Sequence, residues 1–307
     1  MPGFIDRTSS KKQLVHFMLL ALIAVMPAQK LSAQAAQSGS VNMEYADMVY
    51  ASVQGLDLAL DIYMPENVVN PPLVVFMHGG AWQFGNKRSE YPVQFVEHGF
   101  AVAGLDFRQS TQARFPAQAH DIKAAVRYLR ANAGRFGFNA DRIAISGYSS
   151  GAHLATLVGV TNGHTELEGN LGDYLDTSSD VQAIISYYGA HDLTSILGQS
   201  TYFGLGVRVP ALQLLLGAQP VEVPDLAQLA SPVFHVDEGD PPLLLFHGDE
   251  DIQMPIDQSY QMDAAYKALG LDVYFDVVEG AAHGCAGFFA PDKLERALDF
   301  LKRTIAN

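Results

Sequence analysis

The sequence has a single cysteine, Cys285, and charged residues make up only 17% of its 307 positions. One cysteine excludes an intramolecular disulfide, so stability must come from a core rather than from cross-links. The apolar fraction of 49% is sufficient for a large core. There is no Cys-x2-Cys or His-x3-His spacing, and we therefore expect neither a metal nor another cofactor.

Basic residues are also scarce. The chain has 19 Lys and Arg against 33 Asp and Glu, which gives a formal net charge of −14 at pH 7. A surface of this sign repels phosphate backbones and anionic lipid head groups. The composition therefore excludes nucleic acid as a favourable partner, whereas neutral small molecules and sugars are not repelled.

An apolar stretch from Leu14 to Pro27 is shorter than the ~20 residues that a membrane-spanning helix requires. The basic segment Arg7 to Lys12 precedes it, and the small residues of Ala33-Gln34-Ala35 follow it. This arrangement is typical of a secretory signal peptide. We predict a signal peptide over residues 1–35, no stable membrane anchor, and a secreted or periplasmic mature chain.

The remaining residues, 36–307, alternate β-rich runs with helical segments. The segment Pro116 to Arg130 places apolar residues at helical spacing, with proline at its start. Such alternation predicts one α/β domain with a mainly parallel sheet covered on both faces. The strands are expected at 45–53, 56–63, 73–77, 100–105, 142–146, 182–187, 243–246 and 273–278.

Ser149 lies in Gly147-Tyr148-Ser149-Ser150-Gly151, a G-x-S-x-G sequence that follows the expected strand 142–146. The glycines permit a turn from strand to helix that is too tight for Cβ atoms, and this turn projects the serine Oγ above the sheet edge. The pattern alone is weak, but the apolar segment 152–158 can continue as the required helix. We therefore predict that Ser149 is a nucleophile.

A serine nucleophile needs a base and an acid that orients the base. The seventh expected strand ends at His247-Gly248-Asp249-Glu250-Asp251, and the eighth ends shortly before His283. The carboxyl ends of parallel strands meet at one edge of a sheet, where ligands bind in open α/β folds. His283 is the predicted base, and both Asp249 and Asp251 are candidates for the acid.

Backbone N–H groups should stabilise the oxyanion that forms when the serine attacks. The expected strand 73–77 is followed by His78-Gly79-Gly80-Ala81-Trp82, and the glycines let this backbone approach an acyl oxygen closely. We expect Gly80, Ala81 and Ser150 to be the donors.

These motifs together resemble the α/β-hydrolase superfamily, on the branch of small carboxylesterases similar to acetyl-xylan esterases, feruloyl esterases and hormone-sensitive-lipase-like esterases. The resemblance implies an eight-stranded, mostly parallel sheet flanked by helices, and it selects Asp251, three residues after the glycine of the His-Gly pair, as the acid. Ala81 stands where many relatives have a third glycine, and Ser150 where many have alanine. The matching stretches, from about residue 73 to the C-terminal helix, are His78-Gly79-Gly80-Ala81-Trp82, Asp106-Phe107-Arg108, Phe115-Pro116-Ala117-Gln118, Gly147-Tyr148-Ser149-Ser150-Gly151-Ala152-His153-Leu154-Ala155, His247-Gly248-Asp249-Glu250-Asp251 and His283-Gly284.

Between residues 188 and 232 the strand–helix pattern loosens, at the place where such hydrolases carry a small cap. We expect a cap that walls the substrate pocket and, being short, favours small acyl groups. Trp82 and Tyr148 are predicted to line this pocket, with a structural role as the alternative for each. His153 is expected to pack and hydrogen-bond beneath the serine turn.

The sequence thus predicts a secreted serine carboxylesterase for short-acyl esters, with acetyl or feruloyl groups on sugars among the substrates. One alternative is an amide hydrolase, either a formamidase or a peptidase resembling the catalytic domain of prolyl oligopeptidase. Export disfavours the first, and the missing propeller disfavours the second. The other alternative is a catalytically silent hydrolase fold that acts as a binding module, which the presence of all three triad candidates disfavours.

Overall fold

The structure is a computed structural model that describes residues 43–89 and 92–306. The predicted signal peptide, residues 1–35, lies outside these residues. Within the described ranges, no helix is long and apolar enough to cross a membrane.

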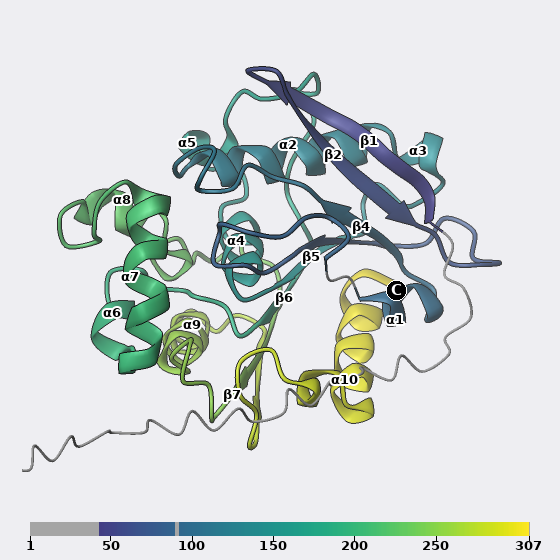
Figure 1. Cartoon of the computed structure of the whole chain (residues 1–307). Coiled ribbons are helices and arrows are strands. Elements are labelled where there is room, and N and C mark those ends of the chain that lie inside the picture. Colours follow the sequence, from purple (N-terminus) through teal and green to yellow (C-terminus); the bar gives the residue numbers. More distant parts are fainter. Residues whose placement is uncertain (1–42, 90–91, 307) are drawn as a thin grey trace, which may run out of the picture. The chain divides into compact units, whose positions relative to one another are not determined.

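Eight strands form one sheet in the order β1-β2-β4-β3-β5-β6-β7-β8 (Figure 1). β1 and β2 pair antiparallel, as do β2 and β4, and all other neighbouring strands are parallel. The predicted eight-stranded, mostly parallel sheet is therefore confirmed. The strands are β1 Met43–Val53, β2 Leu56–Tyr63, β3 Leu73–Met77, β4 Ala101–Leu105, β5 Ile143–Tyr148, β6 Ala183–Tyr187, β7 Leu243–Gly248 and β8 Val273–Val278.

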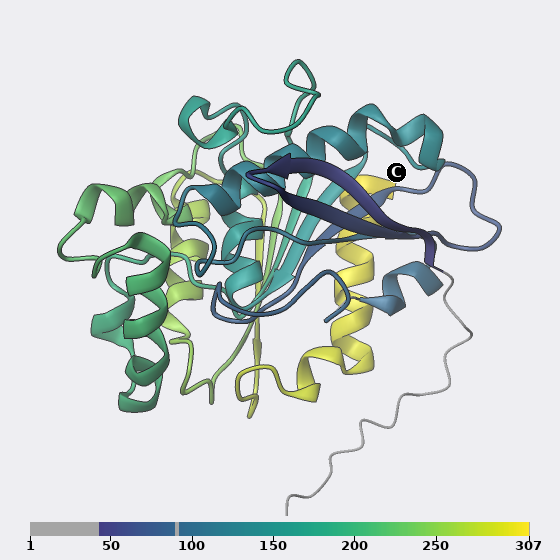
Figure 2. The same cartoon turned by 45° about the horizontal axis from the view of Figure 1, so that its top comes forward.

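Helices cover both faces of the sheet, and three more helices form the insertion between β6 and β7. The helix expected at 116–130 is α2. Figures 1 and 2 show α6, α7 and α8 grouped together beside α9. The helices are α1 Val93–Glu97, α2 Ala117–Ala131, α3 Ala133–Phe136, α4 Ser150–Gly159, α5 Thr165–Glu168, α6 Ile196–Gln199, α7 Tyr202–Leu216, α8 Pro224–Leu229, α9 Asp257–Ala268 and α10 Pro291–Leu301, with short 3-10 turns at Pro232–Phe234 and Ala286–Phe289 and a π turn at Lys302–Ala306.

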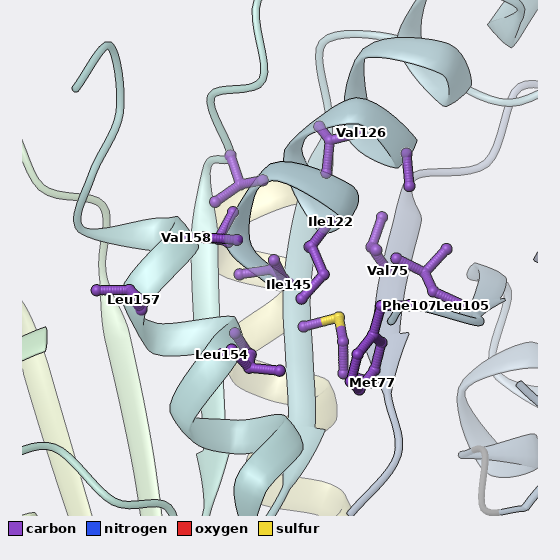
Figure 3. Close-up of a cluster of buried hydrophobic side chains, with 14 of the residues drawn as sticks. Val75, Met77, Leu105, Phe107, Ile122, Val126, Ile145, Leu154, Leu157 and Val158 are labelled. Carbon is purple, nitrogen blue, oxygen red and sulfur yellow. The ribbon is translucent and has the colours of Figure 1, made fainter. Parts of the chain in front are cut away.

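The central strands are continuous apolar runs because they are buried on both faces. Alternate side chains of β3 enter two different cores. Val75 and Met77 belong to the larger core, where α2 and α4 pack with Ile122 and Leu154 (Figure 3). Phe76 belongs to the second core, which is covered by α1 and α10. The sheet is thus held from both sides, which fixes the ends of β3 and β5.

Buried charges fasten the C-terminal end of α4 to α2. Lys123 on α2 is fully buried. Its Nζ donates to the carbonyl of Thr161, just beyond α4, at 2.5 Å and to Oε1 of Glu168 at 2.6 Å. Arg127, one turn later, donates to Oε2 of Glu168 at 2.9 Å. Burial lowers the pKa of Lys123, and the Glu168 carboxylate opposes this by stabilising the ammonium.

We expect Glu168→Gln to lower the free energy of unfolding by about 3 kcal/mol, because it leaves two buried cations without a counter-charge. Urea denaturation would measure the change. The matched control is Glu166→Gln on the same short helix, where the side chain is exposed. An equal loss of unfolding free energy in the two variants would show that pairing of the Glu168 carboxylate with Lys123 and Arg127 does not stabilise the fold.

Candidate active site

Ser149 occupies a strained turn between β5 and α4, with φ 52° and ψ −118°. Two glycines make this elbow (residues 147–151) possible. A Cβ on Gly151 would lie 2.4 Å from the carbonyl oxygens of both Met77 and His78, and one on Gly147 would lie 2.5 Å from the carbonyl carbon of Gly151. The elbow therefore depends on direct backbone contact between the start of α4 and the end of β3.

The side chains of Ser149, His283 and Asp251 form one hydrogen-bonded series. Nε2 of His283 lies 3.0 Å from the Ser149 Oγ, and Nδ1 lies 2.6 Å from Oδ2 of Asp251. With the proton on Nδ1, the ring donates to Asp251 and accepts from the serine hydroxyl. Asp249, the other acid candidate, instead accepts from the N–H of Gly280 at 2.6 Å. The geometry thus places Asp251, and not Asp249, at the histidine.

Asp251 is held in a fully buried position by several donors. Its Oδ1 accepts from the N–H of Gln253 at 2.9 Å and of Met254 at 2.8 Å, and His247 Nε2 lies 3.5 Å from its Oδ2. Burial acts to raise the pKa of Asp251, but the hydrogen bonds from His247, His283 and the Met254 backbone lower it below its usual range. The carboxylate is therefore ionised beside His283.

The predicted oxyanion donors lie on two segments that the elbow brings together. Gly80 and Ala81 belong to the oxyanion loop (residues 78–82), where both have positive φ, 117° and 53°. A Cβ on Gly80 would lie 2.2 Å from the carbonyl oxygen of Phe84, so this position requires glycine. Ser150 is the first residue of α4, where an N–H has no partner within its helix.

Trp82 and His153 fasten the oxyanion loop to the elbow helix. The buried Trp82 indole donates from Nε1 to Nδ1 of His153 at 3.0 Å, and His153 Nε2 donates to the carbonyl of Ala230 at 2.7 Å. Burial lowers the pKa of His153 to about 4, so the ring is neutral with both nitrogens occupied. The predicted supporting role of His153 is confirmed.

Tyr148, the second predicted pocket residue, is 5% exposed and lies among other aromatic rings. Its ring contacts Phe76, Tyr187 and Phe289 at centroid distances of 4.8, 5.1 and 5.4 Å. Trp82 is similarly enclosed, at 1% exposure. Both residues adjoin the proposed reacting groups in sequence, and their contact with substrate stays a prediction.

The cap, consisting of α6, α7 and α8, contacts the loops that carry the acid and the oxyanion donors. Thr201 accepts from the N–H of Gly204 at 3.0 Å as the N-cap of α7, and its hydroxyl donates to the carbonyl of Ile252, beside Asp251. Arg208, about two turns into the helix, is fully buried, with its guanidinium carbon 5.8 Å from the centre of a Trp82 ring. Arg208 is not among the residues predicted from the sequence, although it is the single charged residue of α7.

The arrangement can support attack by a serine oxygen on a carbonyl carbon. It contains an alcohol, an imidazole oriented by a carboxylate, and backbone N–H groups at the adjacent loop. Among the residues that the structure describes, no group of three or more His, Cys, Asp or Glu side chains is placed to hold a metal ion.

Comparison with protein families and curated sequences agrees with this chemistry. The BD-FAE family model matches residues 60–266, more than half of the chain. Esterase LipQ of Mycobacterium tuberculosis is 30% identical over 223 residues, which cover 70% of this chain and 51% of LipQ. Isoprenylcysteine alpha-carbonyl methylesterase ICME of Arabidopsis thaliana is 29% identical over 79% of this chain and 57% of its own length. The chain thus spans about half the length of these curated relatives.

Solved structures match over a larger share of their length. A truncated carbohydrate esterase from gut microbiota has a TM-score of 0.78 and 32% identity, over 85% of this chain and 95% of that one. Thermogutta terrifontis esterase 2 phosphonylated by sarin has a TM-score of 0.70 and 27% identity, again over 85% and 95%. The fold is therefore that of the α/β-hydrolases.

We expect Gly151→Ala to lower the free energy of unfolding by about 2 kcal/mol, because the added methyl group must push α4 away from the end of β3. Thermal denaturation would measure this loss. Gly134→Ala in α3 is the matched control, since its Cβ would meet no heavy atom within 4 Å. An unchanged melting temperature for Gly151→Ala would show that the elbow tolerates a side chain there.

Proposed function

The chain belongs to the BD-FAE family, and from this membership we propose that it is a serine carboxylesterase that hydrolyses short-acyl esters through an acyl-enzyme. The observation that carries the proposal is the continuous series from Ser149 through His283 to Asp251 at the elbow. Similarity to named esterases supports it from an independent direction.

In the proposed reaction, Nε2 of His283 takes the Ser149 proton as Oγ attacks the ester carbonyl carbon. The carbonyl oxygen becomes an oxyanion, which the N–H groups of Gly80, Ala81 and Ser150 stabilise. The imidazolium then protonates the departing alcohol, and the acyl group stays on Ser149. Water repeats the same steps to release the acid and restore the serine.

Asp251 contributes in two ways. Its hydrogen bond keeps the proton of neutral His283 on Nδ1, so that Nε2 faces the serine with a lone pair. Its negative charge stabilises the imidazolium that forms during attack. The backbone donors of Gln253 and Met254 hold the carboxylate in place for both tasks.

We further propose acetyl or feruloyl groups on sugars as the natural substrates. Similarity to a carbohydrate esterase from gut microbiota supports a carbohydrate ester. The cap consists of three helices, the longest of which is α7. Because so short a cap can enclose only a small pocket, we expect small acyl groups to be preferred over long chains.

Ser149→Ala should abolish turnover of p-nitrophenyl acetate, and Asp251→Asn should lower kcat by about 10⁴ while the fold is retained. Wild-type kcat/KM should fall from acetate through butyrate to octanoate. Asp249→Asn is the matched control for the acid, because the Asp249 carboxylate accepts from the Gly280 N–H and not from His283, so turnover should stay near the wild-type value. Full activity in Asp251→Asn would reassign the acid.

Two further readouts separate the alternatives to an esterase. A fluorophosphonate should label the wild-type protein and spare Ser149→Ala, whereas a silent binding fold would not react. Serine-dependent cleavage of p-nitroacetanilide without cleavage of the matching ester would indicate an amide hydrolase instead.

We also propose that residues 1–35 direct export and are then removed. N-terminal sequencing of the protein recovered from the periplasm or culture medium should begin at Ala36. An intact Met1 on the exported protein would overturn this proposal.

A further inference from the structure

Arg208 is a buried cation whose guanidinium has no hydrogen-bond partner among the described residues. Buried charges are normally paired or hydrogen-bonded, as Lys123 and Arg127 are with Glu168. Arg208 is 0% exposed, yet Nε, Nη1 and Nη2 have no hydrogen-bond partner among the described residues. A guanidinium has five N–H donors, and those of Arg208 find no acceptor among the described residues. An acceptor from a bound molecule could therefore satisfy them.

The position of Arg208 relates it to the triad. Its guanidinium packs against Trp82 in the oxyanion loop. Gly204, one turn earlier on α7, lies so close to Ile252 and Gln253 that a Cβ would be 3.0 to 3.1 Å from their carbonyl oxygens. Arg208 thus lies on the helix face that packs between the oxyanion loop and the residues following Asp251.

Arg208 remains a cation at neutral pH. Burial lowers its pKa to about 10, and the negative charge of Asp251 acts in the opposite direction. Asp251 does not serve as its partner, because the carboxylate is already occupied by His283, Gln253 and Met254. The guanidinium is therefore stabilised by the charge of Asp251 through space, but no described residue accepts a hydrogen bond from it.

We propose that Arg208 is the recognition group for a carboxylate carried by the ester substrate, an inference that rests on the proposed esterase function. The planar guanidinium fork matches a carboxylate in two parallel hydrogen bonds. A substrate without an acceptor group would leave the N–H donors of Arg208 unpaired, whereas a carboxylate supplies acceptors and a directly hydrogen-bonded negative charge.

Arg208 is enclosed, so the proposed binding includes a movement of the first turns of α7 against the contacts of Thr201 and Gly204 with Ile252 and Gln253. Three features of this part of the helix favour such a movement. Gly204 and Gly206 lower its helical propensity, and Pro210 has no N–H to donate to the carbonyl of Gly206. The Tyr202 side chain at its start is 95% exposed, so it contributes little packing. The proposed binding therefore includes an outward movement of residues 202–209 that opens the guanidinium to the carboxylate.

Binding can be tested without any turnover. Succinate should bind Ser149→Ala protein in calorimetry and raise its melting temperature, while succinamide, its neutral analogue, should do neither. Adding Arg208→Met should abolish the succinate effect, and Arg208→Lys should retain part of it because the charge remains. The matched control Arg135→Met removes an exposed arginine on α3 and should leave binding intact. Absence of succinate binding, or binding that survives Arg208→Met, would overturn the inference.

Kinetics then show which side of the ester carries the carboxylate. The comparison of mono-p-nitrophenyl succinate with p-nitrophenyl butyrate tests the acyl side, and that of 4-acetoxybenzoate with phenyl acetate tests the alcohol side. In one pair, the kcat/KM preference for the acidic ester should fall about tenfold or more in Arg208→Met. Unchanged preferences in both pairs would also reject the inference.

The two experiments keep this inference separate from the proposed function. If succinate does not bind but Ser149 is required for ester hydrolysis, only the assignment of Arg208 fails. If succinate binds through Arg208 but no ester is hydrolysed, the carboxylate site stands and the esterase proposal fails.

Discussion

The backbone contact between the start of α4 and the end of β3 is the constraint on which the candidate site depends. Because Gly151 rests on the carbonyls of Met77 and His78, the serine turn and the oxyanion loop begin from one fixed point. The strained backbone of Ser149 persists because the packed sheet and helices hold the chain on either side. The buried cluster of Lys123, Arg127 and Glu168 secures the opposite end of α4, so the helix is restrained at both ends.

A second set of contacts joins the site to the cap. Trp82, His153 and the Ala230 carbonyl form a neutral hydrogen-bonded series from the oxyanion loop to the segment after α8. The contact of Thr201 with the Ile252 carbonyl joins α7 to the other side of the site. The cap is therefore attached to both loops that flank Ser149, so the proposed substrate pocket and the proposed catalytic residues share these contacts.

Much of the fold could be predicted because the strands are doubly buried and read as uninterrupted apolar runs. The expected strand 73–77 is β3 without change, and the strand expected at 243–246 extends to Gly248 because ladder pairing with β8 continues. Local patterns located Ser149 and His283, but choosing between Asp249 and Asp251 required the family resemblance. Arg208 could not be assigned, since its surroundings come from Trp82 and Asp251, far away in the chain.

The cap lies between β6 and β7, in a different part of the sequence from Ser149, Asp251 and His283. The proposed catalytic residues Ser149, Asp251 and His283 follow β5, β7 and β8, whereas α6, α7 and α8 lie in one continuous stretch between β6 and β7. If the cap selects substrates as proposed, substitutions on its surface that spare Thr201 and Gly204 can alter this selectivity without displacing the loop that carries Asp251. Under that proposal, selectivity can diverge through substitutions within a single contiguous segment of the chain.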